Sequence, residues 1–570
     1  MYDLKQYLPT TRKEMTLRGW ECADVILFSG DAYIDHPSCG AAVIGRVLED
    51  AGYRVAIVPQ PDWRGDYRDF TKLGRPRLFF GVTAGAMDSM VNHYTAARRK
   101  RSDDAFSPDG QAGHRPDYCT ITYCKILREL FGDIPIVIGG IEASMRRLGH
   151  YDYWTDRLMP SILADSRADL LVYGMGEKAM VEIAQRGIRK DIPQTAYLIS
   201  NEQIHNGGLA KDECGEWETI ALHSFEEEQK DKRKHAENFR VIETESNKQT
   251  AKRLTQKTGK ETVVVNPPYP ALTEEELDHI YDLPYQYMPH PKYKDKRIPA
   301  YEMIRFSVCI HRGCFGGCAF CTISAHQGKQ IVSRSKASIL KQIDKLRQLP
   351  DWKGYLSDLG GPSANMYGIE GKDKRLCEKC ARASCLHPKM CKNLNKDFSR
   401  LLDLYHAVDA LPYIKKSFVG SGIRYDLMDE RYGRELIEKH VSGRLKVAPE
   451  HRADKVLDLM RKPSWEEYLR FRDFFYRVNA DCGLRQQLIP YFISSHPGCT
   501  DNDMRMLADE TKRMGYHPEQ VQDFTPTPMT LSTTMFYTGL NPYTMDKIYV
   551  AKTDKEKRRQ NSYFFWWKHN

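Results

Sequence analysis

Three cysteines in the middle of the chain lie close together in the sequence. They form the segment Cys314-Phe-Gly-Gly-Cys318-Ala-Phe-Cys321, which reads C-x3-C-x2-C and follows the apolar stretch 304–310. A structural zinc site takes four protein ligands, and an ordinary 4Fe–4S cluster takes four cysteines. Three thiolates can therefore surround one small inorganic centre and leave one iron open to a ligand that is not protein. The alternative is a zinc site that takes Cys309 as its fourth ligand, but Cys309 lies in the preceding expected strand, where we expect a core residue.

A second group of cysteines lies further along the chain. The pattern Cys377-x2-Cys380-x4-Cys385-x5-Cys391 provides four thiols within fifteen residues, surrounded by lysines and arginines. Four thiols are enough to close a tetrahedral site without other ligands. A zinc ion and an auxiliary iron–sulfur cluster both fit this pattern, and a chance grouping is the third reading. We expect a metal-stabilised insertion.

The composition is typical of a soluble, multidomain protein. At 570 residues the chain is long enough for roughly three to four domains. Hydrophobic residues make up 41% and charged residues 28%, and the net charge of +9 is a mild bias that is no evidence for nucleic acid. No apolar run reaches the ~18 residues that would span a membrane, and the first residues lack a signal-peptide pattern. We expect a cytoplasmic protein without a membrane partner.

The cysteine count supports the same compartment. Seven of the 15 cysteines fall in the two tight groups, and in a reducing compartment such grouping indicates metal rather than disulfides. The scattered cysteines are expected to be ordinary small apolar residues, among them Cys22, Cys119, Cys214 and Cys482.

Apolar stretches alternate with helical patterns from about residue 23 to residue 188. This alternation predicts an α/β domain over 1–198 with a doubly wound parallel sheet. Ligands of such sheets bind at the carboxyl ends of the strands. Those ends carry Asp35-His36, Gly139-Gly140-Ile-Glu142 and Gly174-Met-Gly176-Glu177. Either these residues form tight turns and caps, or they line a cobalamin- or nucleotide-like pocket.

The rest of the chain divides into three further regions. Residues 199–300 are rich in Glu, Lys, Gln and Asn and are expected to form a charged linker or insertion. Residues 301–530 show six β-α units, too few for the eight of a closed barrel, which predicts a partial (β/α)6 barrel with a cysteine-rich insertion at 362–397. The basic, aromatic tail 531–570 is expected to end in a helix whose aromatic residues dock on the barrel, with nucleic-acid contact as the alternative.

At the first cysteine group the sequence resembles the radical SAM superfamily. Arg312-Gly313-Cys314 leading into Gly-Cys318-Ala-Phe-Cys321, and Leu359-Gly360-Gly361-Pro362 after the second strand, match its cluster loop and its glycine motif. The resemblance implies a 4Fe–4S cluster held by the three cysteines, with S-adenosylmethionine (SAM) on the fourth iron. The cofactor-binding residues that it implies are Phe320 against the adenine, Gly360 and Gly361 for the amino group, and Ser421, Arg424 and Glu450 for the ribose and carboxylate.

Two features qualify these assignments. The acidic residue that often follows the two glycines is Pro362 here, so that contact must come from backbone or from Ser363. For Arg424 and Glu450 the alternative is an ion pair inside the barrel.

Nearly the whole chain resembles the YgiQ-type radical SAM proteins. The resemblance rests on Ser29-Gly-Asp-Ala-Tyr-Ile-Asp-His-Pro-Ser, Asp358-Leu-Gly-Gly-Pro-Ser-Ala-Asn-Met-Tyr and Lys446-Val-Ala-Pro-Glu-His. It implies a cobalamin-domain-like N-terminal region before the radical SAM barrel. The usual D-x-H-x-x-G cobalamin motif is absent, because Asp35-His36-x3-Gly40 has a different spacing. That difference argues against histidine-ligated cobalamin and leaves open base-off binding without a protein ligand.

The sequence therefore predicts a radical SAM enzyme of unidentified substrate that cleaves SAM to a 5′-deoxyadenosyl radical. A flavodoxin- or ferredoxin-type protein is the expected electron donor. An RNA methylthiotransferase, or another RNA-modifying radical SAM enzyme, is the alternative within this class, although no TRAM-like barrel is recognisable after Thr527. The alternative from another class is a zinc-dependent nucleic-acid-binding protein that uses Cys377–Cys391 and the basic tail.

Overall fold

The computed structural model describes residues 3–205 and 217–568, which form two compact units. The first unit comprises Met1–Lys234, Gln249–Pro270 and Asp278–Arg305, and the second comprises His235–Lys248, Ala271–Leu277 and Phe306–Asn570. Over the described ranges, no helix combines the length and the apolar character needed to cross a bilayer. Of the scattered cysteines, Cys119 is buried, Cys22 and Cys482 are half-buried, and Cys214 lies outside the described residues.

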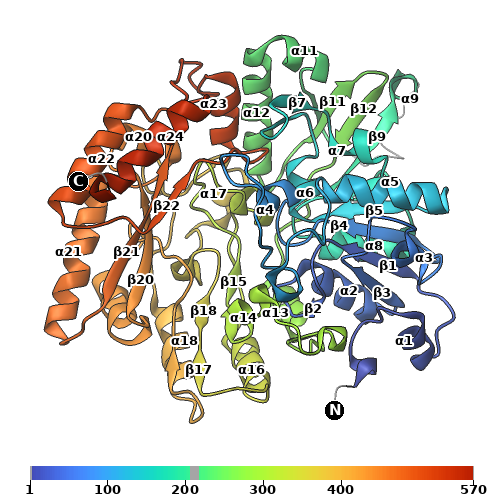
Figure 1. Cartoon of the computed structure of the whole chain (residues 1–570), viewed down its shortest axis with the longest axis horizontal. Coiled ribbons are helices and arrows are strands. Elements are labelled where there is room, and N and C mark those ends of the chain that lie inside the picture. The colour runs from blue at the N-terminus through green and yellow to red at the C-terminus, as the bar shows by residue number, and fades with distance from the viewer. Residues whose placement is uncertain (1–2, 206–216, 569–570) are drawn as a thin grey trace. The chain divides into compact units, whose positions relative to one another are not determined.

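A sheet with five parallel strands is the centre of the first unit. Its parallel strands are β1 (Val25–Ser29), β3 (Val55–Pro59), β4 (Phe79–Thr83), β5 (Ile136–Gly139) and β8 (Leu170–Val172). They lie in the order β3-β1-β4-β5-β8, and Figure 1 labels the first four of them. Val25 of β1 is in register with Val55 on one side and Phe79 on the other. This is the flavodoxin-like strand order, in which the order of successive strands reverses between β1 and β4. Every residue of β1 and β3 is buried, which explains the unbroken apolar runs in the sequence.

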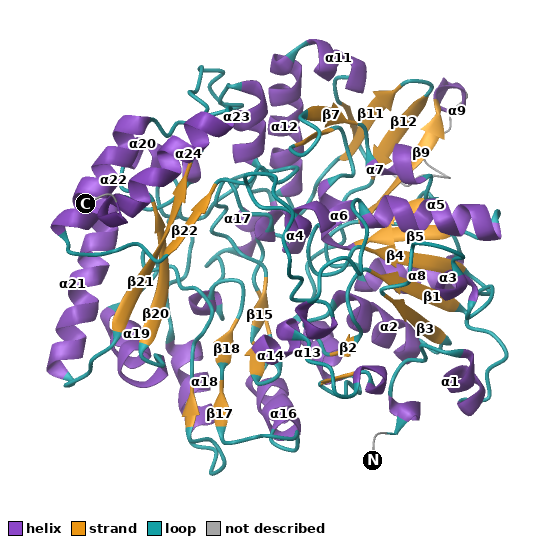
Figure 2. Cartoon of the chain, viewed as in Figure 1, coloured by secondary structure: helices purple, strands orange, loops and turns teal. Residues whose placement is uncertain are grey.

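Helices cover both faces of this sheet (Figure 2). Helix α2 (Gly40–Asp50) packs on α8 (Glu177–Arg186), and α5 (Cys119–Phe131) packs on α7 (Ile162–Ser166). The doubly wound α/β architecture is thus confirmed. The shorter elements of the unit are α1 (Arg12–Leu17), β2 (Ile34–Asp35), α3 (Arg68–Thr71), α4 (Ser89–His93), α6 (Gly140–Met145), β6 (His150–Asp152), β7 (Arg157–Met159), α9 (Asn201–His205), α11 (Phe225–Lys230), β13 (Met288–Pro289) and α14 (Pro299–Ile304).

The stretch 199–300 is not a simple linker, which corrects the expectation from its composition. It continues the sheet beyond β9 (Thr195–Ser200) with β10 (Thr219–Ala221), β11 (Arg253–Thr258) and β12 (Glu261–Val265). Strands β11 and β12 form an antiparallel hairpin that turns at Gly259, where φ is +58°. The run Thr262-Val-Val-Val is fully buried, but the charged helices α11 and α12 (Lys232–Ser246), which precede the hairpin in the sequence, masked it in the average composition.

The second unit contains the partial barrel. Its parallel strands follow one another in sequence as β14 (Ser307–Cys309), β17–β18 (Tyr355–Leu356 and Asp358–Gly360), β19 (Lys416–Ser417), β20 (Arg444–Glu450), β21 (Gln487–Ser494) and β22 (Gln520–Asp523). Strand β18 pairs with β14, β17 pairs with β19, and β20 to β22 form a parallel ladder. These six strand positions confirm the predicted partial (β/α)6 barrel.

Helices follow the strands as the sequence indicated. Those around the barrel are α16 (Lys336–Leu346), α18 (Ser399–Asp409), α19 (Glu430–Glu435), α20 (Asp454–Met460), α21 (Trp465–Asp481) and α22 (Asp501–Arg513). The loop after β14 adds a short hairpin of β15 (His311–Arg312) and β16 (Val332–Ser333) with α15 (Ile323–Gln327) between them, and the insertion contains α17 (Lys374–Glu378).

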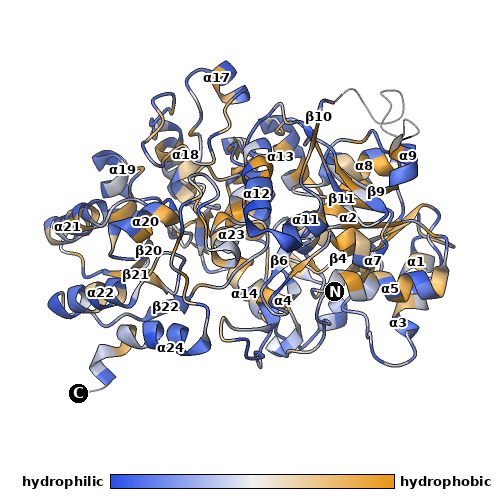
Figure 3. Cartoon of the chain, turned by 90° about the horizontal axis from the view of Figure 1, so that it is seen from above, coloured by the Kyte–Doolittle hydropathy of each residue, from blue (hydrophilic) through white to orange (hydrophobic). Residues whose placement is uncertain are grey.

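The C-terminal segment packs on the barrel. It contains α23 (Leu531–Thr538), α24 (Asp554–Ser562) and a short 3-10 helix, Tyr563–Lys568. Figure 3 shows α24 as a largely hydrophilic helix. Phe564 is nevertheless buried, and the Trp566 indole nitrogen donates to the hydroxyl of Thr511 on α22 at 3.1 Å. The aromatic end of the tail therefore docks as expected.

Truncating this anchor should destabilise the second unit. We expect Phe564→Ala to lower the free energy of unfolding by about 3 kcal/mol, because removing a buried aromatic ring leaves a cavity. Urea denaturation measures the change. The matched control is Ser562→Ala, an exposed position on the preceding helix, which should change stability by less than about 0.5 kcal/mol. Equal stability of the two variants would show that the tail does not dock.

Candidate functional site

The first cysteine group lies on a closed loop after strand β14. The hairpin of β15 and β16 joins the two ends of this loop, and the backbone nitrogen of Cys314 donates to the carbonyl of Gly328 at 3.1 Å. Within the loop, the Ser324 hydroxyl donates to the carbonyl of Cys314 at 2.7 Å. The three cysteines therefore lie at the carboxyl end of the first barrel strand, where active sites of β/α barrels are built.

Two helices of the same unit, α20 and α23, also hold the loop in place. Ala319, between the second and third cysteines, is buried against Leu531 and Met535 of α23. Its backbone nitrogen donates to the carbonyl of Met460 at 3.0 Å, and its carbonyl accepts from the backbone nitrogen of Ser532 at 2.9 Å. The C-terminal segment thus positions the cysteine loop rather than forming a separate tail.

The three thiols share a small, electrostatically distinct environment. Burial raises the pKa of Cys314 and brings that of Cys321 to about 12, and the neighbouring Cys318 sulfur raises both further. The Arg424 guanidinium opposes this for Cys314, and its Nη1 donates to the Cys318 sulfur at 3.5 Å. A bound metal deprotonates thiols outright, so this donor set fits a metal–sulfur centre. Cys309 instead donates to the carbonyl of His311 at 3.2 Å.

The described residues contain no group of three His, Cys, Asp or Glu side chains gathered closely enough to hold a single metal ion. This applies to both cysteine groups.

Gly360 and Gly361 must be glycines because neighbouring side chains leave no room for a Cβ atom. A Cβ on Gly360 would lie 2.5 Å from the hydroxyl oxygen of Ser421, and a Cβ on Gly361 would lie 2.5 Å from the Cε1 atom of His311. The Ser421 hydroxyl donates to the carboxylate of Asp358, which also accepts from the backbone nitrogens of Gly420 and Ser421 at 2.8 and 3.0 Å. The motif thus brings the second and third strands together beside the cysteine loop.

His311 is a site residue that the sequence analysis missed. It is 1% exposed, and neither of its ring nitrogens has a hydrogen-bond partner among the described residues. Burial lowers its pKa to about 3, so the imidazole is neutral. An unsatisfied buried imidazole is costly unless a ligand completes its hydrogen bonds. Its position three residues before Cys314 was the only signal in the sequence.

Arg424 and Glu450 each form an ion pair with another residue of the second unit rather than with each other. Arg424 makes a bidentate bond to Asp426, with Nε–Oδ1 at 2.7 Å and Nη2–Oδ2 at 2.6 Å. Glu450 faces Lys462, whose Nζ lies 3.8 Å from its carboxylate. Burial raises the pKa of Glu450, which has a left-handed backbone with φ at +70°. Neither Asp426 nor Lys462 stands out in the sequence as a partner of these residues.

Phe320 lies beside a buried histidine of the fifth strand's loop. Its ring centroid is 6.2 Å from that of His496 in an edge-to-face arrangement. The Nε2 of His496 bonds with the hydroxyl of Ser532 at 2.6 Å. Phe320 thus packs on His496, which bonds the same serine, Ser532, that binds the backbone of Ala319.

In the first unit, the residues at the carboxyl ends of the strands are engaged in hydrogen bonds and ion pairs within the fold. Asp35 is fully buried and pairs with Arg46. His36 is buried, its Nδ1 accepts from the backbone nitrogen of Ser38 at 3.0 Å, and its ring packs edge-to-face on Tyr287.

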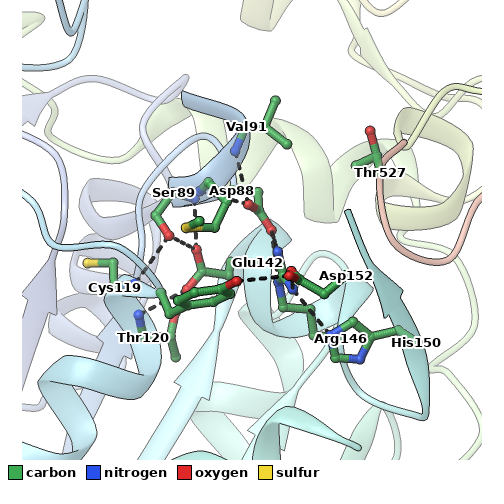
Figure 4. A network of polar contacts seen from close by, with 12 residues as sticks. Asp88, Ser89, Val91, Cys119, Thr120, Glu142, Arg146, His150, Asp152 and Thr527 are labelled. Atoms are coloured by element: carbon green, nitrogen blue, oxygen red, sulfur yellow. Dashed lines mark hydrogen bonds and ion pairs between the residues drawn. The ribbon is translucent and has the colours of Figure 1, made fainter. Parts of the chain in front are cut away.

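Glu142 is engaged in the same way. Its carboxylate accepts from the backbone nitrogen and hydroxyl of Ser89 at 2.7 and 2.5 Å and from the backbone nitrogen of Thr120 at 3.0 Å (Figure 4). Nearby, Arg146 bridges Asp88 and Asp152 at 2.9 and 3.1 Å. This network ties the loops after β4 and β5 to α5, which supports the structural reading of these residues.

Comparisons with known proteins identify relatives along the whole chain. A family model described as the radical SAM N-terminal region matches residues 7–307, and a domain of unknown function (DUF3362) matches residues 519–570. A UPF0313 protein of Bacteroides thetaiotaomicron is 59% identical over 100% of this chain and 95% of its own length. UPF0313 proteins of Porphyromonas gingivalis and Methanocella arvoryzae are 57% and 49% identical, covering 100% and 96% of this chain and 91% of each relative.

Among solved structures, the radical S-adenosylmethionine methyltransferase TsrM from Kitasatospora setae is similar at a TM-score of 0.47. The sequence identity is 14%, and the similarity covers 89% of this chain and 75% of that protein.

Proposed function

Because this chain belongs to the UPF0313, or YgiQ-type, branch of the radical SAM family, we propose that it is a radical SAM enzyme with Cys314, Cys318 and Cys321 as the ligands of its 4Fe–4S cluster. The observation that carries the proposal is the arrangement of three half-buried thiols on one closed loop at the carboxyl end of a barrel strand. A trio of cysteine ligands leaves one iron without a protein ligand. When bound, the cluster supplies the electron that cleaves SAM to methionine and a 5′-deoxyadenosyl radical, which takes hydrogen from the substrate.

The protein's own residues would hold and orient SAM. We assign its adenine to Phe320, its amino group to the backbone at Gly360 and Gly361, and its ribose and carboxylate to Ser421, Arg424 and Glu450. Support comes from the burial of Arg424 and Glu450 and from the tight approach of Ser421 to the glycine motif. The bidentate bond to Asp426 fixes the Arg424 guanidinium against the Cys318 sulfur, so Arg424 positions the loop as well.

Delivery of the electron requires an external donor. We assign this role to a flavodoxin- or ferredoxin-type protein of the cytoplasm. The reducing compartment is supported by the sequence, in which seven of the 15 cysteines fall in two tight groups of the kind that holds metal.

Anaerobic purification followed by metal and product analysis tests the proposal. Iron, sulfide, zinc and cobalt are quantified first, and the protein is then reduced with dithionite in the presence of SAM. We expect iron and sulfide in equal amounts, and 5′-deoxyadenosine and methionine in equal amounts. Zinc without iron, or SAM left intact by a protein that holds its full cluster, would contradict the proposal. The cobalt measurement shows separately whether cobalamin copurifies. His36 is buried and offers no exposed imidazole as a ligand for cobalt.

His311 provides a more specific prediction for SAM binding. We expect His311→Phe to retain its iron but to bind SAM about tenfold more weakly, because one hydrogen bond from a buried imidazole is worth about 1.4 kcal/mol. Equilibrium binding of SAM to the reconstituted, unreduced protein measures the change. His311→Gln keeps a polar group at this position and should recover part of the affinity. An unchanged affinity in His311→Phe would exclude contact between this side chain and SAM.

A further inference from the structure

We propose that Cys377, Cys380, Cys385 and Cys391 hold a second iron–sulfur cluster, docked directly on the loop of the first. The four cysteines lie in the insertion between β18 and α18, and all four are unpaired and half-buried. Two backbone hydrogen bonds fold the insertion around them: Cys380 donates to the carbonyl of Cys377 at 3.1 Å, and Cys391 donates to that of Cys385 at 2.7 Å. A bridge between Gly371 and Leu394 closes the base of the insertion.

Two of the sulfurs receive hydrogen bonds from outside the cysteine pattern. The buried Lys329 ammonium lies 3.5 Å from the Cys380 sulfur and also donates to the carbonyls of Cys380 and Arg382 at 3.1 and 2.7 Å. The Asn393 amide nitrogen donates to the Cys377 sulfur at 3.4 Å. Donors that point at sulfur stabilise thiolates and are characteristic of the surroundings of metal–thiolate centres. This feature distinguishes the group from a chance cluster of thiols.

The four thiols provide a complete ligand set for a 4Fe–4S cluster, which takes four cysteines. The backbone folds them into one small lobe. Contact of this lobe with the first cysteine loop favours a cluster over a structural zinc ion. His387, the histidine within the group, is engaged elsewhere, since its Nε2 bonds Asp458 at 2.8 Å.

The insertion contacts the first cysteine loop through backbone atoms. The nitrogen of Cys385 donates to the carbonyl of Phe315 at 3.0 Å, and the hydroxyl of Ser384 donates to the carbonyl of Gly316 at 2.7 Å. Gly317 packs so closely that a Cβ would overlap the carbonyl oxygen of Ala383. One hydrogen bond therefore connects a ligand of the second centre with the residue next to Cys314.

This contact gives the second cluster a function that rests on the proposed radical SAM activity. With both clusters bound, the second would pass one electron to the first and would then regain one electron from a low-potential donor of the flavodoxin or ferredoxin class. The short path through Cys385 and Phe315 suits this transfer, and the Lys329 ammonium would stabilise the added negative charge at the Cys380 sulfur.

Iron content per chain tests the proposal independently of catalysis. We expect about eight irons in the anaerobically reconstituted protein and about four after replacement of Cys377, Cys380, Cys385 and Cys391 by serine. Replacement of Cys314, Cys318 and Cys321 by alanine should also leave about four irons. Only this alanine variant should lose the cleavage of SAM by the dithionite-reduced protein, which distinguishes loss of the first site from loss of the second. One zinc per chain that disappears in the serine variant, or about four irons in the wild type that the serine changes do not reduce, would overturn the proposal.

Lys329→Met provides a second test that keeps all four ligands in place. We expect this variant to retain about eight irons but to show a more negative midpoint potential for one of its two clusters in a redox titration, because a positive charge at a sulfur favours the reduced state.

The variant with all four cysteines of the insertion replaced by serine provides a kinetic test. Flavodoxin should reduce its first cluster at least tenfold more slowly than in the wild type. Two unshifted potentials in Lys329→Met, with unchanged reduction in the serine variant, would contradict a cluster at this position.

Discussion

Replacement of Cys314, Cys318 and Cys321 together by alanine is expected to remove about four irons per chain and to reduce 5′-deoxyadenosine formation to the background of a protein-free reaction. The three thiols are the only cysteine ligands of the first cluster in our account, and no cleavage of SAM can occur without its electron. Because the loop is also fixed through Ala319 and Gly328, the fold of the second unit should survive the change. Iron analysis and product quantification by chromatography measure the two effects.

Cys309→Ala is the matched control. This thiol lies in the strand just before the loop and bonds the carbonyl of His311, so its loss should leave both the iron content and the cleavage of SAM unchanged. Loss of iron in Cys309→Ala would make Cys309 a fourth ligand and contradict an open iron. Full iron content in the triple variant would contradict the site altogether.

Gly317→Ala is expected to disrupt the cluster loop from the side of the insertion. The residue has φ at +59°, and the added Cβ would overlap the carbonyl oxygen of Ala383. The left-handed backbone costs an alanine about 1 kcal/mol, and overpacking adds about 1–3 kcal/mol. We expect at least a twofold loss of bound iron after gel filtration of the reconstituted protein, and a lower unfolding midpoint of the second unit.

Gly483→Ala separates the two contributions. Gly483 has nearly the same backbone conformation, with φ at +64°, but a Cβ there would meet no atom within 4 Å. This variant should lose about 1 kcal/mol of stability and retain its iron. If Gly317→Ala and Gly483→Ala held equal amounts of iron, the contact between the insertion and the loop would not support the cluster.

The features that could be predicted from the sequence are local ones. The strand before Cys314, the glycines of the loop and the alternation of apolar strands with helices are all encoded within short windows, and the structure contains them. The hairpin β11–β12 was missed because its buried valines are few and lie between strongly charged helices. Average composition over 199–300 therefore predicted a charged linker or insertion where the sheet continues.

The features that could not be predicted depend on contacts between distant segments. An ion pair between Arg424 and Glu450 was one possibility from the sequence. In the structure the Arg424 guanidinium binds Asp426, and the Glu450 carboxylate faces Lys462. Residues 383–385 pack against residues 315–317, which lie about seventy positions earlier in the chain. A contact between such distant segments cannot be predicted from a local sequence pattern. The unsatisfied nitrogens of His311 become visible only once its surroundings are known.

The most direct test of the central claim is the electron paramagnetic resonance spectrum of the reduced protein with and without SAM. We predict that adding SAM changes the signal of the cluster held by Cys314, Cys318 and Cys321, because SAM binds its open iron. The component from Cys377, Cys380, Cys385 and Cys391 should stay unchanged. Spectra that are identical with and without SAM, in a protein that holds its full iron content, would contradict the claim that the three-cysteine site binds SAM.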